Sequence, residues 1–192
     1  MAKTFSSMLP LGTPAPQFSL PDPADGSLWQ FSKFPHATAY LVIFIANHCP
    51  YVVHVADGIA KMAADFQTSG VAVVAINSND IQAYPEDSPE HMKAFAKKHN
   101  FSFPYLFDET QEVARAFDAA CTPDFFLFDE KKRLVYRGQM DSSRPGNGVP
   151  NDGHDLRAAV RDLLAHRKIS PEQRPSLGCN IKWKAQQTSS RL

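Results

Sequence analysis

The stretch Tyr40-Leu-Val-Ile-Phe-Ile-Ala-Asn-His-Cys-Pro50 sets a continuous run of apolar residues, several of them β-branched, directly before a cysteine and a proline. Such a run predicts a strand that is buried on both faces of a sheet. Beyond Pro50, apolar side chains recur every three or four residues as far as Gly70, which is typical of a helix with one buried face. Cys49 therefore lies where a buried strand ends and a helix begins.

A second buried strand, Val71-Ala-Val-Val-Ala-Ile76, follows this helix. Strand, helix and strand form a βαβ unit, and such a unit joins two parallel strands of one sheet. The sequence therefore predicts an α/β domain with a parallel pair at its centre.

The C-terminal half of the chain adds antiparallel strands. Segments 123–129 and 134–138 are rich in apolar residues and are separated by the charged run Glu130-Lys-Lys-Arg133. This pattern predicts an antiparallel hairpin, so the complete sheet should be mixed.

Helices are expected between and after these strands. Ser88-Pro89 is a helix start signal, a short helix is expected at 112–117, and a last helix carries apolar residues at 156–164 after a cap candidate at Asn151-Asp152. Five prolines between residues 10 and 23 disfavour helix in the N-terminal part.

The composition is that of one ordinary soluble domain. The 192 residues include 20 basic and 20 acidic side chains, so the net charge is zero and a general nucleic-acid-binding role is disfavoured. The longest apolar run, residues 37–46, is far shorter than the ~20 residues that span a bilayer, so neither a membrane span nor a signal peptide is expected. Three widely spaced cysteines do not form a secreted disulfide framework, and we therefore expect a cytoplasmic protein.

Several motifs together resemble a known family. They are the opening Gly12-Thr-Pro-Ala-Pro-Gln-Phe-Ser-Leu-Pro-Asp22, Asn47-His-Cys-Pro-Tyr51, Cys121-Thr-Pro-Asp-Phe-Phe-Leu-Phe-Asp129 and Gly178-Cys-Asn-Ile-Lys-Trp-Lys184. The chain resembles, nearly end to end, the redoxin branch of the thioredoxin fold, in a peroxiredoxin-like group named with the alkyl hydroperoxide reductase and thiol-specific antioxidant proteins.

The resemblance implies an architecture and a reaction class. It implies a thioredoxin-like α/β fold with a mixed central sheet flanked by helices, an N-terminal extension, a redoxin domain at 1–168, and a polar C-terminal tail at 169–192 that docks on it. It also implies that Pro123 is the thioredoxin-type proline, usually cis, that faces the redox cysteine.

The chain departs from both parent families at the positions that carry their chemistry. A thioredoxin-type dithiol, with its first cysteine placed at position 46, is missing because that residue is Ala46. The proline and threonine that precede a peroxiredoxin's reactive cysteine by seven and three positions are replaced by Val42 and Ala46. Its arginine would fall near Pro123 and is also absent. We therefore expect slow peroxide reduction.

Cys49 is the candidate nucleophile. Its place at a helix N-terminus offers unpaired backbone donors and the positive end of the helix dipole, which both favour the thiolate, and a charged His48 would add to this. The competing interpretation is a buried structural thiol.

Two other cysteines are candidates to react with an oxidised Cys49. Cys121 precedes Pro123 in a loop that a thioredoxin fold packs against the start of the first helix, and it either resolves Cys49 or is a small buried apolar side chain. Cys179 lies in the tail, and it either resolves Cys49, within or between chains, or serves only in docking.

Other polar residues give weaker indications. His48, Cys49 and His54 permit a zinc or copper site, but the spacing is poor evidence and no metal is expected. Asp124, Asp141-Arg144 and Asn79-Asp80 are more typical of turns and hairpins than of catalysis, although the last pair lies at the carboxyl end of a strand, where ligands often bind. With no phosphate-binding loop and no Ser/His/Asp signature, no organic cofactor is expected.

The sequence thus predicts a thiol-dependent oxidoreductase that reduces a disulfide or a peroxide through a single nucleophile, Cys49, with Cys121, Pro123 and His48 at its site. Its partners would be a thiol or disulfide protein or a small peroxide, and an external thiol reductant. The alternative is a non-catalytic module on the same fold that senses redox state or binds a metal. No pattern selects an oligomeric state.

Overall fold

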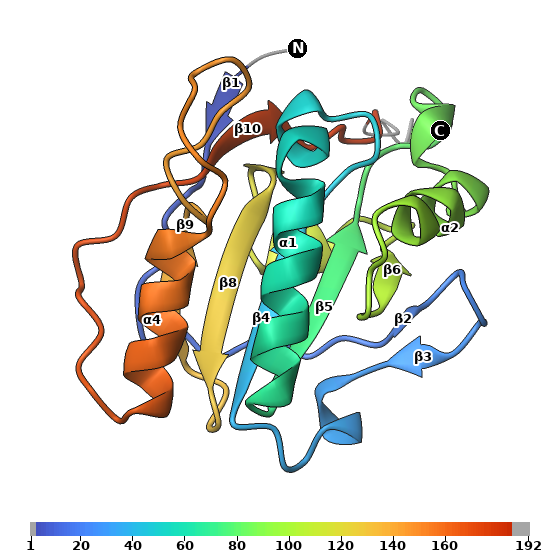
Figure 1. Ribbon diagram of the computed structural model, residues 1–192. Helices are drawn as coiled ribbons and strands as arrows, with labels where there is room; N and C mark the ends of the chain where they lie inside the picture. The colour runs from blue at the N-terminus through green and yellow to red at the C-terminus, as the bar shows by residue number, and fades with distance from the viewer. Residues whose placement is uncertain (1–2, 186–192) are drawn as a thin grey trace, which may run out of the picture.

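The apolar run at residues 40–45 forms the central strand of the main sheet. This strand, β4 (Ala39–Phe44), is buried along its whole length and pairs in parallel with β5 (Val71–Asn77). Helix α1 (Pro50–Thr68) connects the two strands. The predicted βαβ unit is therefore confirmed, and the computed structural model describes it within residues 3–185 (Figure 1).

The main sheet is mixed, as predicted. Its strand order is β6-β5-β4-β8-β9, in which β8 (Asp124–Asp129) lies antiparallel to β4, and β9 (Leu134–Gly138) completes the hairpin. The edge strand β6 (Tyr105–Phe107) pairs in parallel with β5 and was not predicted, because three residues are too few to show a periodicity.

Alternate residues of β4 point into two different apolar clusters, because successive side chains of a strand face opposite sides of a sheet. Leu41 and Ile43 pack with α1, with α2 (Pro89–Lys98) and with α4 (His154–Leu164) on one face. Tyr40, Val42 and Phe44 pack on the other face with α3 (Glu112–Ala116) and the N-terminal extension. The sheet is thus covered on both sides, and α1 and α4 lie in front of it in Figure 1.

The proline-rich N-terminal extension carries no α-helix within the described residues. It forms the short strands β2 (Leu20–Pro21) and β3 (Leu28–Trp29) and a single 3-10 turn, Phe31–Lys33. Phe18 stacks on Trp29 with ring centroids 5.1 Å apart. These aromatic rings supply the cover for the second face of the sheet.

A second, three-stranded sheet lies at the end of the molecule where α1 begins (Figure 1). Its order is β1-β10-β7, so the C-terminal strand β10 (Leu177–Asn180) inserts between β1 (Lys3–Phe5) and β7 (Cys121–Thr122). Residues 177–180 of the tail are therefore a strand paired on both edges. The last part of the predicted tail, residues 186–192, lies outside the described residues.

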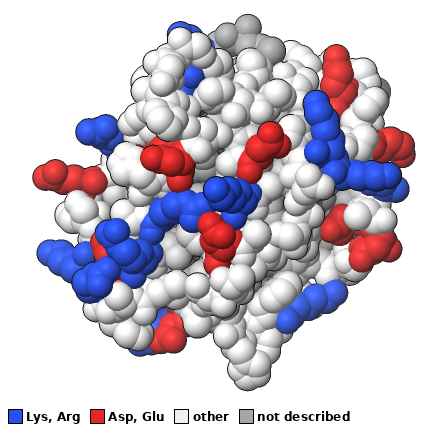
Figure 2. Space-filling model, viewed as in Figure 1, with Lys and Arg blue, Asp and Glu red and all other residues white. Residues whose placement is uncertain are grey.

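None of the helices described within residues 3–185 is long and apolar enough to cross a membrane. On the face shown in Figure 2, basic and acidic side chains form a mixed band across the middle of the molecule. The end of this face at which α1 begins is mostly uncharged.

Candidate active site

Cys49 is the N-cap of α1, and Pro50 is the first residue of that helix. This is the junction that the sequence predicted, because Pro50 cannot donate a backbone hydrogen bond and is well tolerated in the first helical turn. The Cys49 side chain is fully buried, with 0% of its surface exposed. Its thiol Sγ donates a hydrogen bond to the Thr122 carbonyl oxygen at 3.1 Å.

Thr122 and Pro123 form the opposite wall of the site. The peptide bond between them is cis, and the Thr122 carbonyl faces the Cys49 thiol. Both residues are supplied by the junction of β7 and β8, which lies 73 residues beyond Cys49 in the chain. The fold thus brings Pro123 to the position that the family resemblance implies.

Cys179 lies against Cys49. The two thiols belong to the same apolar cluster, and α1 contacts β10. Burial and the neighbouring Cys49 side chain together raise the pKa of Cys179 to about 12, and the nearby Lys182 opposes this shift. The structure therefore places a second, protonated thiol at the candidate nucleophile.

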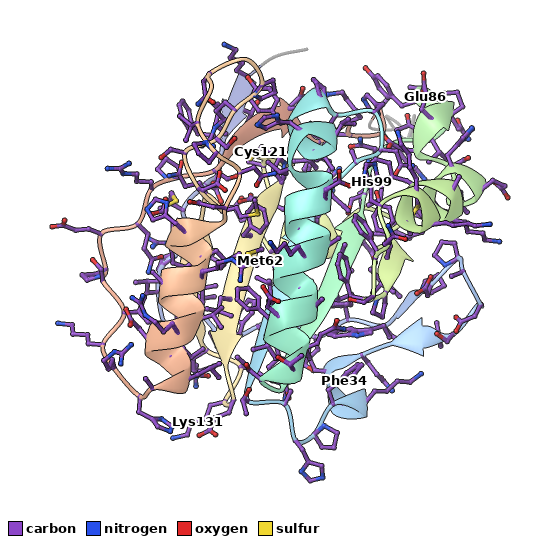
Figure 3. The ribbon with its side chains drawn as sticks, in the orientation of Figure 1. Phe34, Met62, Glu86, His99, Cys121 and Lys131 are labelled. Atoms are coloured by element: carbon purple, nitrogen blue, oxygen red, sulfur yellow. The ribbon has the colours of Figure 1, made fainter. Side chains whose placement is uncertain are left out.

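Cys121 is also buried and lies near the start of α1 (Figure 3). Its Sγ lies 3.7 Å from the Pro123 carbonyl oxygen, and Cys121 is not a member of the cluster that contains Cys49. Burial raises the Cys121 pKa far above its ordinary value, and the neighbouring Asp124 raises it further. This thiol is therefore neutral across the physiological range.

Asp124, the first residue of β8, is a buried carboxyl group without a close hydrogen-bond partner among the described residues. Burial raises its pKa to about 8. Three nearby groups favour the ionised form but do not offset the effect of burial: the Ser6 hydroxyl and the amides of Ala120 and Phe125. At neutral pH the group is therefore mostly protonated.

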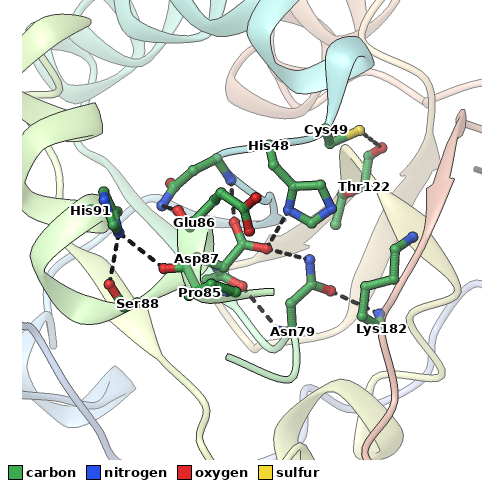
Figure 4. A network of polar contacts seen from close by, with 12 residues as sticks. His48, Cys49, Asn79, Pro85, Glu86, Asp87, Ser88, His91, Thr122 and Lys182 are labelled. Carbon is green, nitrogen blue, oxygen red and sulfur yellow. Dashed lines mark hydrogen bonds and ion pairs between the residues drawn. The ribbon is translucent and has the colours of Figure 1, made fainter. Parts of the chain in front are cut away.

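His48 is held in place by a buried carboxylate that the sequence did not reveal. Asp87, with 0% exposure, accepts hydrogen bonds at 2.7 Å from His48 Nδ1, Asn79 Nδ2 and the Asn47 amide (Figure 4). Burial alone would raise the Asp87 pKa, but these hydrogen bonds, with His48 first, lower it. Because Asp87 is ionised, Nδ1 of His48 carries the proton.

The other ring nitrogen of His48 has no partner within the described residues. The ring stacks on Tyr84 at 5.1 Å with an interplanar angle of 7°, and Nε2 is buried. The Asp87 contact could not be found from sequence, because it joins residues 39 positions apart and Asp87 precedes an ordinary helix start at Ser88-Pro89.

The network continues into the C-terminal tail. Asn79 Oδ1 accepts the Lys182 amide at 2.8 Å, and the Lys182 carbonyl accepts hydrogen bonds from the Asp80 amide and from Gln111 Nε2. Asn79, just after β5, thus connects Asp87, the carboxylate that binds His48, to the segment that follows β10.

The remaining candidate residues form hydrogen bonds that stabilise the loops around the site. His54 Nε2 lies 2.8 Å from the Ser143 hydroxyl and does not join His48. Asp141 accepts the Ser143 and Gly153 amides, while Arg144 donates to backbone carbonyls and to Gln139. Within residues 3–185, no three His, Cys, Asp or Glu side chains are grouped as metal ligands.

The helix geometry also shows where a second cysteine of a helical dithiol would stand. Ala46 precedes α1, whereas Val52, fully buried, lies in its first turn, three residues after the N-cap Cys49. Side chains three residues apart on a helix are neighbours. If Cys49, the N-cap residue, is the first cysteine of such a dithiol, its partner would stand at position 52, which holds valine. The missing cysteine is then the second one, at Val52, and not a first one at Ala46.

A family model described as Redoxin matches residues 10–153, three quarters of the chain. The chain belongs to the Redoxin family. The matched range of this redoxin includes Cys49 and the cis peptide at Pro123, and it ends before β10. Cys179 thus lies in a segment that the family model does not cover.

Three similar proteins show how far the likeness extends in sequence and in fold. An uncharacterized conserved protein of Geobacillus kaustophilus has a crystal structure that is 50% identical, covers 96% of this chain and 97% of its own, and superposes with a TM-score of 0.93. A Mycobacterium tuberculosis (strain CDC 1551 / Oshkosh) protein, whose name assigns it provisionally to the peroxiredoxins, is 29% identical over 116 residues, 60% of this redoxin and 68% of its own length. The thiol:disulfide interchange protein of Chlorobium tepidum shares the fold, with 21% identity, 80% and 97% coverage and a TM-score of 0.60.

Proposed function

We propose that this redoxin is a thiol-dependent oxidoreductase in which Cys49 is the nucleophile. The single observation that carries the proposal is the placement of the Cys49 sulfur at the N-cap of α1, against the carbonyl that precedes cis-Pro123. A helix N-terminus favours the thiolate, which is the reactive form of cysteine. Family membership supports the same reaction class, since one sequence relative has a peroxiredoxin name and a thiol:disulfide interchange protein shares the fold.

The reaction with a disulfide begins when the Cys49 thiolate attacks one sulfur atom. A bond forms between that sulfur and Cys49, and the other sulfur leaves as a thiolate that takes up a proton. With a hydroperoxide, the thiolate takes the distal oxygen to form a sulfenic acid, and the remaining alkoxide leaves as an alcohol or water after protonation. A second thiol then reduces Cys49, and an external thiol reductant restores the starting state.

We infer that His48 assists this chemistry. Asp87 and the Tyr84 ring fix the imidazole next to Cys49 in the chain, and its Nε2 is left without a protein partner among the described residues. We assign His48 the uptake of the Cys49 thiol proton at Nε2 and the delivery of this proton to the leaving group. Its pairing with an ionised Asp87 keeps the other proton on Nδ1 and leaves Nε2 free to accept. We place the reaction in the cytoplasm, where a thiol reductant is supplied.

The direct test is modification of the reduced protein with oxidised glutathione and, separately, with hydrogen peroxide. Trypsin separates the three cysteines into peptides 34–61, 116–131 and 169–182, so each thiol is read independently by mass spectrometry. We expect Cys49 to react first. The C49S variant should lose at least about 100-fold of any disulfide or peroxide turnover. Unreacted Cys49 in a folded protein at neutral pH would overturn the proposal.

A second candidate function has one observation in its favour, which is the complete burial of Cys49. A thiol that no substrate reaches in the folded state is suited to a redox-sensing module that is oxidised without turnover. In that case Cys49 would be modified once and slowly, and added reductant would not sustain consumption of glutathione disulfide. Multiple turnovers per protein would reject the sensor.

A further inference from the structure

The second thiol of the site is provided by the C-terminal strand. Cys179 of β10 is 3% exposed and packs in the apolar cluster that contains Cys49. The neighbouring Cys49 side chain contributes to the raised pKa of Cys179, and β10 contacts α1, the helix that Cys49 caps. The two thiols therefore lie in one site of the folded chain.

The strand register separates Cys179 from Cys121. Cys179 lies opposite Thr122, and Asn180 lies opposite Cys121. Adjacent positions of a strand face opposite sides of a sheet, so the side chains of Cys179 and Cys121 face opposite sides. Of these two, Cys179 belongs to the apolar cluster that contains Cys49. The register therefore presents Cys179 and not Cys121 to the nucleophile.

The register of β10 is fixed by a glycine. A Cβ atom on Gly178 would lie 1.9 Å from the Thr122 carbonyl oxygen and 2.6 Å from its carbon, both backbone atoms. Only glycine allows β10 to approach the Thr122–Pro123 peptide this closely. The residue after this glycine, Cys179, is held beside the N-terminus of α1 as a consequence.

Hydrogen bonds on both sides of Cys179 hold the strand in place. On one side, the Ser176 hydroxyl donates to the Pro123 carbonyl at 2.6 Å. On the other, Asn79 and Gln111 bind the Lys182 backbone, and the Gln111 amide oxygen also accepts the Lys184 amide. The position of the Cys179 sulfur is thus set by the body of the domain.

We propose that Cys179 resolves oxidised Cys49 within the same chain, forming a Cys49–Cys179 disulfide. This inference rests on the proposed function of Cys49. When Cys49 is a sulfenic acid, the Cys179 sulfur displaces its hydroxyl, so the S–O bond breaks, an S–S bond forms and water leaves. When Cys49 is in a mixed disulfide, Cys179 attacks the Cys49 sulfur, and the substrate's second thiolate leaves and is protonated. An external thiol then reduces the internal disulfide.

The protonation of Cys179 fits this order of events. Burial and the contact with Cys49 raise the Cys179 pKa, so Cys179 keeps its proton in the reduced protein. The nearby Lys182 lowers the pKa and so favours release of this proton when Cys179 attacks. In the reaction with a sulfenic acid, the released proton leaves with the hydroxyl group as water.

The experiment is linkage mapping in the unreduced wild-type protein. Substoichiometric hydrogen peroxide or oxidised glutathione is added, free thiols are alkylated, and tryptic peptides are analysed without reduction. We expect peptide 34–61 to be joined to peptide 169–182, at a protein concentration low enough to exclude links between chains. C121S should retain this link, because Cys121 faces the other side of the sheet.

The C179S and C179A variants give the second measurement. Without Cys179, the mixed disulfide of Cys49 with glutathione should persist at least about 10-fold longer, because only external thiols remain to release it. With peroxide, sulfinic Cys49 should accumulate in place of the internal disulfide. Agreement between the serine and alanine variants excludes an effect of the new hydroxyl group.

The outcomes separate the inference from the function on which it rests. Modified Cys49 without a link to Cys179, or with a link to Cys121, would overturn the inference and leave the proposed function standing. Links found only between chains would also overturn it. Unmodified Cys49 under every condition would overturn both.

Discussion

Replacing Asp124 with asparagine should stabilise the protein, and increasingly so as the pH rises. Asp124 is fully buried at the start of β8, neither oxygen has a close hydrogen-bond partner among the described residues, and burial raises its pKa from 3.8 to about 8. A carboxyl group with a raised pKa binds its proton more tightly in the folded than in the unfolded state. Its contribution to stability is therefore complete below pH 4 and is lost as the pH rises towards 8.

The size of this effect follows from the two pKa values. Each pH unit between them costs about 1.4 kcal/mol, so the folded protein loses ~6 kcal/mol in all. Between pH 5 and pH 8 the loss is about 4 kcal/mol. Because Asp124 is 0% exposed, solvent does not screen this penalty. Asparagine has a similar shape and no charge, so D124N should be free of this loss.

The assay is urea unfolding of wild type and D124N at pH 5, 6, 7 and 8, with reductant to keep the cysteines free. The difference in unfolding free energy should move in favour of D124N by about 4 kcal/mol over this range. The exposed Glu130→Gln variant, directly after β8, controls for loss of a carboxylate and should show no comparable trend. A D124N difference that stays constant within about 1 kcal/mol would refute the reasoning.

Three further predictions concern the residues around the thiols. V52C should form a disulfide between Cys49 and the introduced cysteine under mild oxidation, because the two side chains are three residues apart at the start of α1, and peptide 34–61 should lose two hydrogens. G178A should destabilise the fold by about 3 kcal/mol or more in urea unfolding, because its Cβ meets the Thr122 carbonyl. H48Q should slow Cys49 turnover by about 10- to 100-fold and alter its pH profile, because the proton-exchanging ring is lost.

Matched variants show what would contradict these predictions. H36Q replaces an exposed histidine of the N-terminal extension and should leave turnover unchanged; an equal effect of H48Q and H36Q would reject a role for the ring. G146A changes an open glycine with φ of +79° and should cost only about 1 kcal/mol, so an equal loss in G178A would reject the steric argument. If V52C yields only Cys49–Cys179 links, the two positions are not neighbours.

The central sheet could be predicted from sequence because its signal is local. The apolar runs at 40–45 and 71–76 and the hairpin at 123–138 each contain enough residues to reveal a strand. The fold class followed from these runs and from the family motifs. The exact ends of the elements, such as the start of α4 at His154, depend on caps that form only in the folded chain.

The second sheet and the polar network could not be predicted in the same way. Leu177–Asn180 is short and partly polar, and it becomes a strand only because β1 and β7, distant in sequence, bind its two edges. The pairing of His48 with Asp87 joins a strand end to a 3-10 turn (Pro85–Asp87) that no periodicity marks. The sequence shows that Cys179 lies in the tail. It does not show that Cys179 lies near Cys49, because that depends on the register of β10 against β7.

Because the second thiol comes from β10, the C-terminal tail of this redoxin is part of its candidate active site. In a helical dithiol, both sulfurs belong to one turn, and the pair survives whenever the helix is intact. Here Val52 fills that position, and the thiol that contacts Cys49 comes from a strand whose place depends on Gly178, Asn79 and Gln111. An intramolecular Cys49–Cys179 pair therefore requires that β10 be docked, because a detached strand removes its sulfur from the site. Loss of docking would uncover Cys49 and leave its oxidised form without a resolving thiol, so undocking and resolution exclude each other.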